Sequence, residues 1–268
     1  MLNILLAATV PANIITRDDQ RRAMSELLQK LFRRNRPANT QDNQPSENQY
    51  GRQLTDAEIE GGEHRQFVGG MWEEIGVLQF EFLKKMGLMP RHRLIDIGCG
   101  CMRAGVYIVP YLQDRHYYGI DINSSLIEAG RKELLKSPAN AGKRPDLRVT
   151  DQFDLAQFGV QFDYALATSV FTHLYLNHIG RCLVQVKKAL APGGRFFATF
   201  LLAPNPLHLQ PIPQEPAGAQ GIMTHFDRDP FHYSLAEMRM LAGFAGLAVE
   251  LIGDWGHPRN QKMLCFTV

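Results

Sequence analysis

The sequence predicts an α/β fold, with a doubly wound, mostly parallel sheet, helices on both faces and an antiparallel last strand. From about residue 69 onward, short continuous apolar runs alternate with helical periodicity, a pattern typical of parallel strands buried on both faces. A glycine-rich turn between Gly98 and Gly105 joins the first of these runs to a helical segment. The last two apolar runs are joined by a loop short enough for a hairpin, which predicts that the final strand reverses direction.

Each element of this pattern follows from its own residues. Residues 71–90 carry apolar side chains three and four positions apart, which predicts an amphipathic helix that ends near Gly87. Strands are predicted at 93–98, 116–123, 146–154, 162–171, 195–202, 247–253 and 261–268. Helices are predicted at 104–112, 124–136, 176–190 and 235–245, the last opened by a capping box of Ser234 and Glu237. Five prolines within residues 203–221 predict a long irregular loop at the ligand-binding edge of the sheet.

The first part of the chain has a different composition. Residues 16–36 show an amphipathic helical pattern, whereas residues 37–53 are polar and rich in Asn, Gln, Pro and Ser, as linkers are. We therefore divide the chain into an N-terminal helix and polar linker at 1–60 and a compact domain at 61–268. The N-terminal part is expected to serve as a lid or a mobile segment.

Bulk properties narrow the class of protein. The chain has 268 residues, of which 45% are hydrophobic and 21% charged, as is ordinary for a soluble globular protein. A net charge of +2 is too small to indicate a face that binds nucleic acid. No uninterrupted apolar run is long enough for a spanning helix, and the apolar start lacks a preceding basic region. The four cysteines suit reduced thiols, so we expect a cytoplasmic protein.

The glycine-rich turn "DIGCGCMRAG" decides between candidate ligands. Such a turn lets the backbone approach a ligand, and the helix that follows offers unpaired N–H donors. A dinucleotide fingerprint requires G-x-G-x-x-G, but Arg103 takes the third glycine position and Gly105 comes two residues too late. Cys99 and Cys101 lack a second pair at metal-binding spacing, so no metal site is expected.

The positions of two carboxylates restrict the class of ligand further. Asp96 lies next to the end of the first strand, where it would repel a pyrophosphate but complement an ammonium group. Asp121 ends the next strand, where a carboxylate can accept hydrogen bonds from both hydroxyls of a ribose. Together they favour a ligand that combines adenosine with an amino group.

Four motifs in order carry a family resemblance: "LIDIGCGCMRAG", "YYGIDINSSLIEAGRKEL", "FDYALATSVFTHL" and "VKKALAPGGRFFATF". They resemble the motifs of class I S-adenosylmethionine-dependent methyltransferases, in particular bacterial enzymes that act on small molecules. The resemblance extends over residues 69–268. It implies a seven-stranded sheet whose last strand is antiparallel, and S-adenosylmethionine as the cofactor.

The resemblance also assigns cofactor-binding residues by position. Those implied for the methionine part are Asp96, Gly98, Cys99, Gly100, Thr168 and Ser169. Those implied for the ribose and adenine are Asp121, Ile122, Asp151, Gln152 and Phe153. Arg103 departs from the common glycine-rich version of the turn, and it either reaches the cofactor carboxylate or forms a salt bridge elsewhere.

The sequence says less about the residues that contact the methyl acceptor than about those that bind the cofactor. His173 follows the fourth strand of the compact domain at the ligand edge, where it acts either as the base that takes a proton from the acceptor or as a structural helix cap. The predicted acceptor-pocket residues are Trp72, His225, His232, Tyr233 and His257. The alternatives are that the histidines clamp the C-terminal loops and that Trp72 belongs to the core.

We therefore predict an enzyme that transfers a methyl group to an O or N atom, or to carbon, of a small-molecule acceptor. Neither a nucleic acid nor stable membrane insertion is expected. One alternative is an NAD-type oxidoreductase, which Arg103 and Asp96 disfavour. Another is a cofactor-binding protein that lacks transferase activity.

Overall fold

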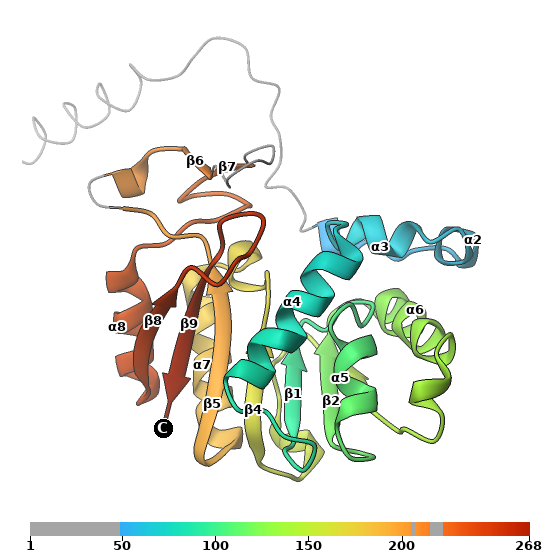
Figure 1. Cartoon of the computed structure of the whole chain (residues 1–268). Coiled ribbons are helices and arrows are strands. Elements are labelled where there is room, and N and C mark those ends of the chain that lie inside the picture. The colour runs from blue at the N-terminus through green and yellow to red at the C-terminus, as the bar shows by residue number, and fades with distance from the viewer. Residues whose placement is uncertain (1–48, 205–206, 215–221) are drawn as a thin grey trace, which may run out of the picture. The chain divides into compact units, whose positions relative to one another are not determined.

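The computed structural model describes residues 49–204, 207–214 and 222–268 and contains a seven-stranded sheet (Figure 1). Its strands are β1 (Leu94–Ile97), β2 (Tyr117–Asp121), β3 (Asp146–Val149), β4 (Phe162–Ala167), β5 (Leu190–Phe200), β8 (Ala248–Gly253) and β9 (Lys262–Thr267). The strand order is β3-β2-β1-β4-β5-β9-β8. The first five strands pair in parallel, whereas β9 runs antiparallel to both β5 and β8. The predicted fold class is confirmed.

Helices cover both faces of the sheet (Figure 1). One face packs against α4 (Trp72–Lys85), α5 (Gly105–Tyr111) and α6 (Ser124–Leu135). The other packs against α7 (Leu176–Ala189) and α8 (Leu235–Ala245). Single 3-10 turns connect several elements: η2 (Pro138–Asn140), η3 (Ala156–Phe158), η4 (Phe171–His173) and η5 (Leu207–Leu209).

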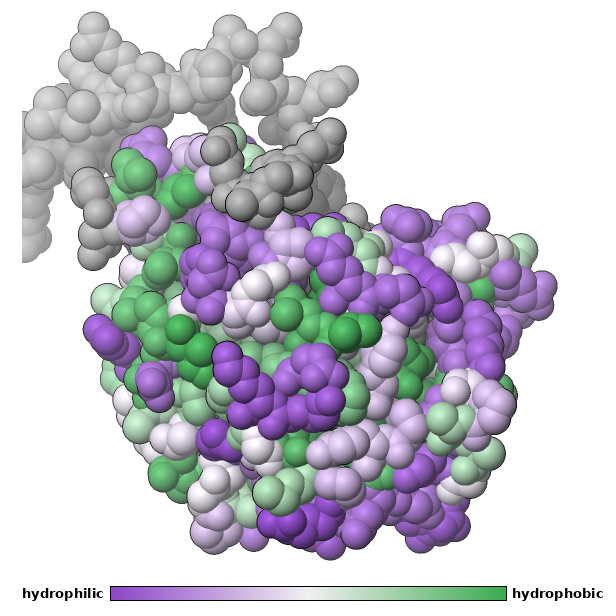
Figure 2. Space-filling view, in the orientation of Figure 1, coloured by the Kyte–Doolittle hydropathy of each residue, from purple (hydrophilic) through white to green (hydrophobic). Residues whose placement is uncertain are grey.

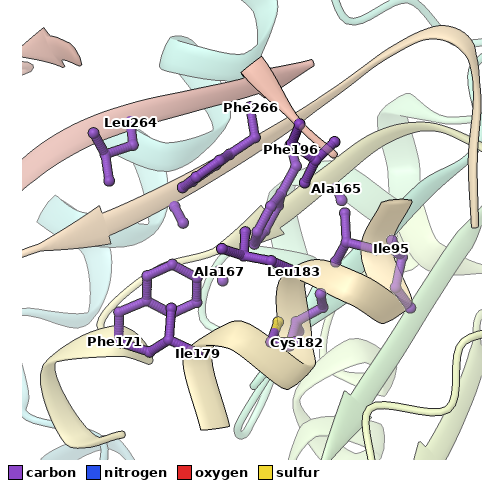
Figure 3. Close-up of a cluster of buried hydrophobic side chains, with 14 of the residues drawn as sticks. Ile95, Ala165, Ala167, Phe171, Ile179, Cys182, Leu183, Phe196, Leu264 and Phe266 are labelled. Atoms are coloured by element: carbon purple, nitrogen blue, oxygen red, sulfur yellow. The ribbon is translucent and has the colours of Figure 1, made fainter. Parts of the chain in front are cut away.

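The alternation of side chains along each strand builds two hydrophobic layers. On β5, Phe196 belongs to the cluster under α7 and α8, while the next residue, Phe197, belongs to the cluster under α4, α5 and α6. Figure 3 shows Leu183 of α7 in the first layer, together with Phe196 and with Phe266 of β9. Both faces of the central strands are buried, which explains why these strands are continuous apolar runs in the sequence.

The residues before the sheet also belong to this compact unit. They form η1 (Gln49–Gly51), α2 (Asp56–Glu60) and α3 (Glu63–Phe67). The Asn123 side-chain amide donates to the carbonyls of Tyr50 and Arg52, at 2.8 and 2.7 Å, and the Leu54 N–H donates to Ser125 Oγ at 2.8 Å. The predicted domain start at residue 61 therefore lies too late. The predicted helix at 16–36 and most of the predicted linker lie outside the described residues.

A buried carboxylate fastens α3 to α6. Glu133 of α6 is within 2.7 Å of His64 Nε2, 2.8 Å of Arg65 Nη2 and 2.9 Å of Lys136 Nζ. Burial alone raises the pKa of a carboxyl group, but the hydrogen bonds from Arg65, Lys136 and His64 lower the pKa of Glu133 to about 2. The ionised carboxylate thus holds the first described helices against the sheet domain.

The proline-rich segment is more regular than its composition predicts. A two-stranded antiparallel ribbon forms between β6 (Ile212–Gln214) and β7 (Ile222–Thr224), with Pro213 opposite Met223. The expectation of a wholly irregular loop was wrong, because each strand of a two-stranded ribbon is an edge strand, and edge strands tolerate proline.

The strand β5 also begins earlier than predicted. It starts at Leu190, so the "APGG" sequence lies within the strand and the helix α7 ends at Ala189. A Cβ on Gly194 would come within 2.8 Å of the Phe162 carbonyl oxygen, so this close approach of β4 to β5 requires glycine.

The surface of the domain has a mixed character. Figure 2 shows hydrophilic residues interspersed with hydrophobic ones over the face in view. None of the helices in the described part of the chain is both long and apolar enough to cross a lipid bilayer.

Truncation of a core side chain should destabilise the domain much more than truncation of its exposed neighbour. Leu183 is fully buried, whereas Val184, next to it on α7, is 38% exposed. We expect Leu183→Ala to lower the free energy of unfolding by about 2–5 kcal/mol through lost burial and a residual cavity. Val184→Ala should change it by about 0.5 kcal/mol or less. Urea unfolding followed by circular dichroism measures both, and equal effects would contradict the packing described.

Candidate active site

A cavity lies at the carboxyl edge of the sheet, where the loops that follow β1, β2, β3 and β4 meet. The residues that line it follow these strands in the chain: Gly98, Cys99, Gly100, Cys101 and Arg103 after β1, Asp121 and Ile122 at β2, Thr150 and Phe153 after β3, and Thr168, Ser169, Val170 and His173 after β4. Ligands of doubly wound sheets bind at this edge. The glycine-rich turn, which the sequence places after the first strand, forms one wall of the cavity.

The backbone of this turn needs its glycines. Gly98 and Gly100 have φ angles of +70° and +51°, which residues with a side chain rarely adopt. A Cβ on Gly98 would also lie within 2.5 Å of Val170 Cγ2. The N–H groups of Gly98 and Cys99 both donate to the Ile120 carbonyl, at 2.8 and 3.0 Å, and thereby fix the turn to β2.

Asp121 joins the turn to the end of β2. Its Oδ2 accepts the Gly100 N–H at 2.8 Å, and its Oδ1 accepts the Asn123 N–H at 2.9 Å. Burial raises the pKa of Asp121, and the backbone N–H groups of Asn123 and Gly100 oppose this rise. Each carboxylate oxygen has a second lone pair, so Asp121 can still accept hydrogen bonds from a ligand. Ile122, also at the cavity, is 44% exposed and offers an apolar surface.

Asp96 is a buried carboxyl group on the wall of the same cavity. It is only 4% exposed, and its Oδ2 accepts a hydrogen bond from the Tyr117 hydroxyl at 2.6 Å. Burial raises the pKa of Asp96 to about 7, although the Tyr117 hydrogen bond favours the charged form. No basic side chain of the described residues lies within salt-bridge distance of it. The carboxylate is therefore available to a cationic ligand.

Arg103 carries a buried positive charge into the cavity. Its Nη1 donates to the carbonyls of Val68 and Gly70, at 3.3 and 3.1 Å. Burial lowers the pKa of Arg103 to about 10. Of the two expectations for Arg103, the salt bridge within the protein is absent from the described residues. On the same cavity, the Thr168 hydroxyl is buried and has no hydrogen-bond partner among the described residues, so the cavity offers polar groups that a bound anion can satisfy.

His173 lies where this cavity meets a second one, and an acidic side chain supports it. The distance from His173 Nδ1 to Asp229 Oδ1 is 2.6 Å. With the proton on Nδ1, the imidazole donates to Asp229 and leaves Nε2 as a proton acceptor. Asp229 comes 56 positions after His173, in the segment "THFDRDPFHY" that also holds three of the predicted pocket residues, but its pairing with His173 was not predicted. The only signal was the acidic character of that segment, which also holds Asp227.

The second cavity has a volume of about 420 Å³ and shares Tyr50, Val68, Ser169 and His173 with the first. Apolar and polar groups complete its wall: Leu201, Ile222, Pro230, Asp229, Arg259 and Gln261. Ser169 Oγ accepts a hydrogen bond from Gln261 Nε2 at 2.9 Å, and this bond joins the loop after β4 to the loop before β9. The two cavities thus meet along the Ser169–His173 segment.

Two of the predicted cofactor-binding residues lie outside both cavities. Asp151 and Gln152 are exposed, and Gln152 Nε2 donates to Asp151 Oδ1 at 2.6 Å, while Gln152 Oε1 accepts from Arg181. Their neighbours Thr150 and Phe153 line the first cavity instead. The bend after β3 turns the side chains of Asp151 and Gln152 toward solvent. The sequence predicts the strand, but it does not predict the direction of the side chains in the bend that follows.

The five predicted acceptor-pocket residues line neither cavity. His232 is fully buried, with Nδ1 2.8 Å from Thr224 Oγ1 and Nε2 2.9 Å from the His208 carbonyl oxygen. Tyr233 packs in the hydrophobic cluster and donates to the Leu174 carbonyl. These two residues clamp the loops, as in the alternative interpretation.

The other three members also lie outside the two cavities. Trp72 is buried in the cluster beside α6, and the Arg65 guanidinium lies 4.8 Å from its ring centroid. His257 is buried and its Nδ1 accepts the Arg259 N–H at 3.1 Å. The backbone of His225 pairs with the Phe231 region, since its N–H donates to the Pro230 carbonyl at 2.9 Å. In the part of the chain that the structure describes, no three His, Cys, Asp or Glu side chains are grouped to hold a metal ion.

Comparisons with known proteins agree with this architecture. Residues 95–196 match the family described as a methyltransferase domain. A demethylmenaquinone methyltransferase of Symbiobacterium thermophilum is 28% identical over 161 residues, which make up 55% of this chain and 57% of that protein. The matched region thus spans little more than half the length of that relative.

Two solved structures show the same fold. An S-adenosylmethionine-dependent methyltransferase from Clostridium acetobutylicum superimposes with a TM-score of 0.57 at 9% identity, over 80% of this chain and 99% of the other. The magnesium protoporphyrin IX methyltransferase of Synechocystis, with bound S-adenosylhomocysteine, gives 0.51 at 14% identity, over 90% of this chain and 94% of the other. The domain match, the strand order and the glycine-rich turn together support a class I S-adenosylmethionine-dependent methyltransferase.

Proposed function

We propose that this chain transfers the methyl group of S-adenosylmethionine to an oxygen or nitrogen atom of a small-molecule acceptor. One observation carries the proposal: the cavity at the glycine-rich turn, with its two buried carboxyl groups, opens at His173 into a second cavity. The first cavity suits the methyl donor, and the second suits the acceptor.

The residues of the first cavity fit the chemical groups of S-adenosylmethionine. Asp96 complements the ammonium group, while Arg103 and Thr168 offer donors to the carboxylate. Asp121 accepts hydrogen bonds from the ribose, and Ile122 and Phe153 provide apolar surface for the adenine ring. When bound there, the cofactor supplies an electrophilic sulfonium methyl group, which an acceptor displaces in line.

His173 and Asp229 are placed to handle the proton of the acceptor. A hydroxyl or protonated amine must lose a proton as it attacks, and His173 Nε2 is the atom that we assign to receive it. Asp229 fixes the imidazole tautomer and stabilises the imidazolium that forms. The shared wall of Ser169 and His173 orients the acceptor toward the donor cavity, so positioning supplies much of the rate.

A small organic acceptor fits the second cavity best. The cavity is enclosed by apolar side chains of Val68, Leu201, Ile222 and Pro230. The similar proteins are named for methylation of demethylmenaquinone and of magnesium protoporphyrin IX, which are also small organic molecules. We assign this chain to the same broad substrate class.

The affinity for S-adenosylmethionine should depend on pH through Asp96. Its raised pKa of about 7 means that the carboxyl group of the free protein takes up a proton as pH falls through 7. Only the ionised form complements an ammonium group, so we expect roughly tenfold weaker binding at pH 6 than at pH 8. Isothermal titration calorimetry measures this dependence. Asp96→Asn should bind weakly with little pH dependence, and a pH-independent wild type would contradict the role of Asp96.

Removal of the proposed base should lower the rate without a change in cofactor affinity. We expect His173→Gln to reduce kcat by about 10²- to 10⁴-fold and Asp229→Asn to reduce it less. S-adenosylhomocysteine release, with a metabolite extract as the acceptor source, measures the rate. His178→Gln is the matched control, because His178 is exposed on α7 and lines neither cavity. A His173→Gln enzyme with at least half of the wild-type rate would exclude His173 as the base.

A further inference from the structure

A second arginine, Arg259, lies on the acceptor cavity. It comes from the loop between β8 and β9 and lines the same cavity as His173 and Asp229. Its backbone N–H donates to His257 Nδ1, and its Nη2 donates to the Gly69 carbonyl. The backbone of Arg259 is therefore fixed by His257, and its guanidinium is held by the neutral Gly69 carbonyl.

No acidic side chain of the described residues neutralises this guanidinium. None of the carboxylates in the described ranges lies within 4.0 Å of the Arg259 nitrogens. Asp229, the acidic residue of the same cavity, bonds to His173 instead. Arg103 also lacks a carboxylate, and the nearby charge of Arg259 adds to the burial that lowers the pKa of Arg103. Two unneutralised cations near one another are costly unless anions bind beside them.

The backbone makes room for Arg259. Gly69 has a φ angle of +93°, and a Cβ on this residue would come within 2.6 Å of Arg259 Nη1. Most of the five N–H donors of a guanidinium remain available when one or two of them bind carbonyl groups. A planar guanidinium with free donors pairs well with a carboxylate, through two parallel hydrogen bonds.

We propose that Arg259 binds a carboxylate group of the methyl acceptor, so that the acceptor is a small organic acid. This inference rests on the proposed methyltransferase function, because it specifies the substrate of the same site. Arg103 serves the donor cavity and Arg259 the acceptor cavity, so each cation has an anion of its own. Apolar residues such as Leu201 and Ile222 enclose the carbon skeleton, and His173 faces the nucleophilic hydroxyl or amine.

A binding experiment with simple probes tests the anion site directly. The full-length protein, loaded with S-adenosylhomocysteine so that the donor cavity is filled, is titrated with benzoate and with benzamide, a neutral analogue of the same shape. We expect benzoate to bind at least tenfold more tightly than benzamide. Arg259→Gln should abolish this preference. Arg228→Gln, which alters an exposed arginine outside both cavities, should retain it. Equal affinity for the two probes, or an unchanged preference in Arg259→Gln, would overturn the proposal.

A labelling experiment separates this inference from the proposed function. The enzyme is incubated with a metabolite extract and S-adenosylmethionine that carries a trideuterated methyl group, and the products are separated by anion exchange and mass spectrometry. The labelled product should be retained as an anion, and Arg259→Gln should raise KM at least tenfold with unchanged affinity for S-adenosylhomocysteine. A labelled but neutral product would overturn the inference and leave the methyltransferase function intact. Cofactor binding without any labelled product would count against the methyltransferase function, and the probe titration would still decide whether Arg259 binds an anion.

Discussion

The bond between the Asp121 carboxylate and the Gly100 N–H, 2.8 Å long, holds the site together. It ties the turn after β1 to the end of β2, and the same carboxylate caps the start of the next loop through Asn123. Asn123 in turn anchors the segment of Tyr50 and Arg52 and caps α6. The side chains of Asp121 and Asn123 thus link the parallel sheet, the glycine-rich turn and the segment of Tyr50 and Arg52.

The first cavity, at the same edge of the sheet, contains both acidic and basic side chains. Asp96 and Asp121 bring carboxyl groups to the first cavity, and Arg103 lines the same cavity with no carboxylate partner of its own in the described chain. This arrangement complements a ligand that carries both an ammonium and a carboxylate group, as an amino acid does. Burial of these charged groups lowers the stability of the ligand-free protein, and a bound ligand of complementary charge offsets this loss.

Local patterns in the sequence were enough to predict the fold and to place Asp96, Asp121 and the glycine-rich turn at one edge of the sheet. The alternation of apolar runs and helices predicted the parallel sheet, and the position of Asp121 at a strand end placed it at the turn it contacts. The acceptor cavity could not be predicted, because His173, Asp229 and Arg259 come from three distant segments. Their meeting depends on loop paths, and nothing in the composition of those loops favoured Asp229 over Asp227. Of the histidines of the same region, His232 is buried and hydrogen-bonded to Thr224 and to the His208 carbonyl, and neither cavity is lined by it.

The central claim is that the glycine-rich turn and its two carboxylates bind S-adenosylmethionine. Equilibrium titration of the full chain with S-adenosylmethionine, S-adenosylhomocysteine and NAD, by calorimetry on wild type and Asp121→Ala, tests it most directly. We predict saturable binding of the first two ligands, no binding of NAD, and loss of binding in Asp121→Ala, with the fold retained by circular dichroism. Tight binding of NAD together with no response to S-adenosylmethionine would contradict this assignment.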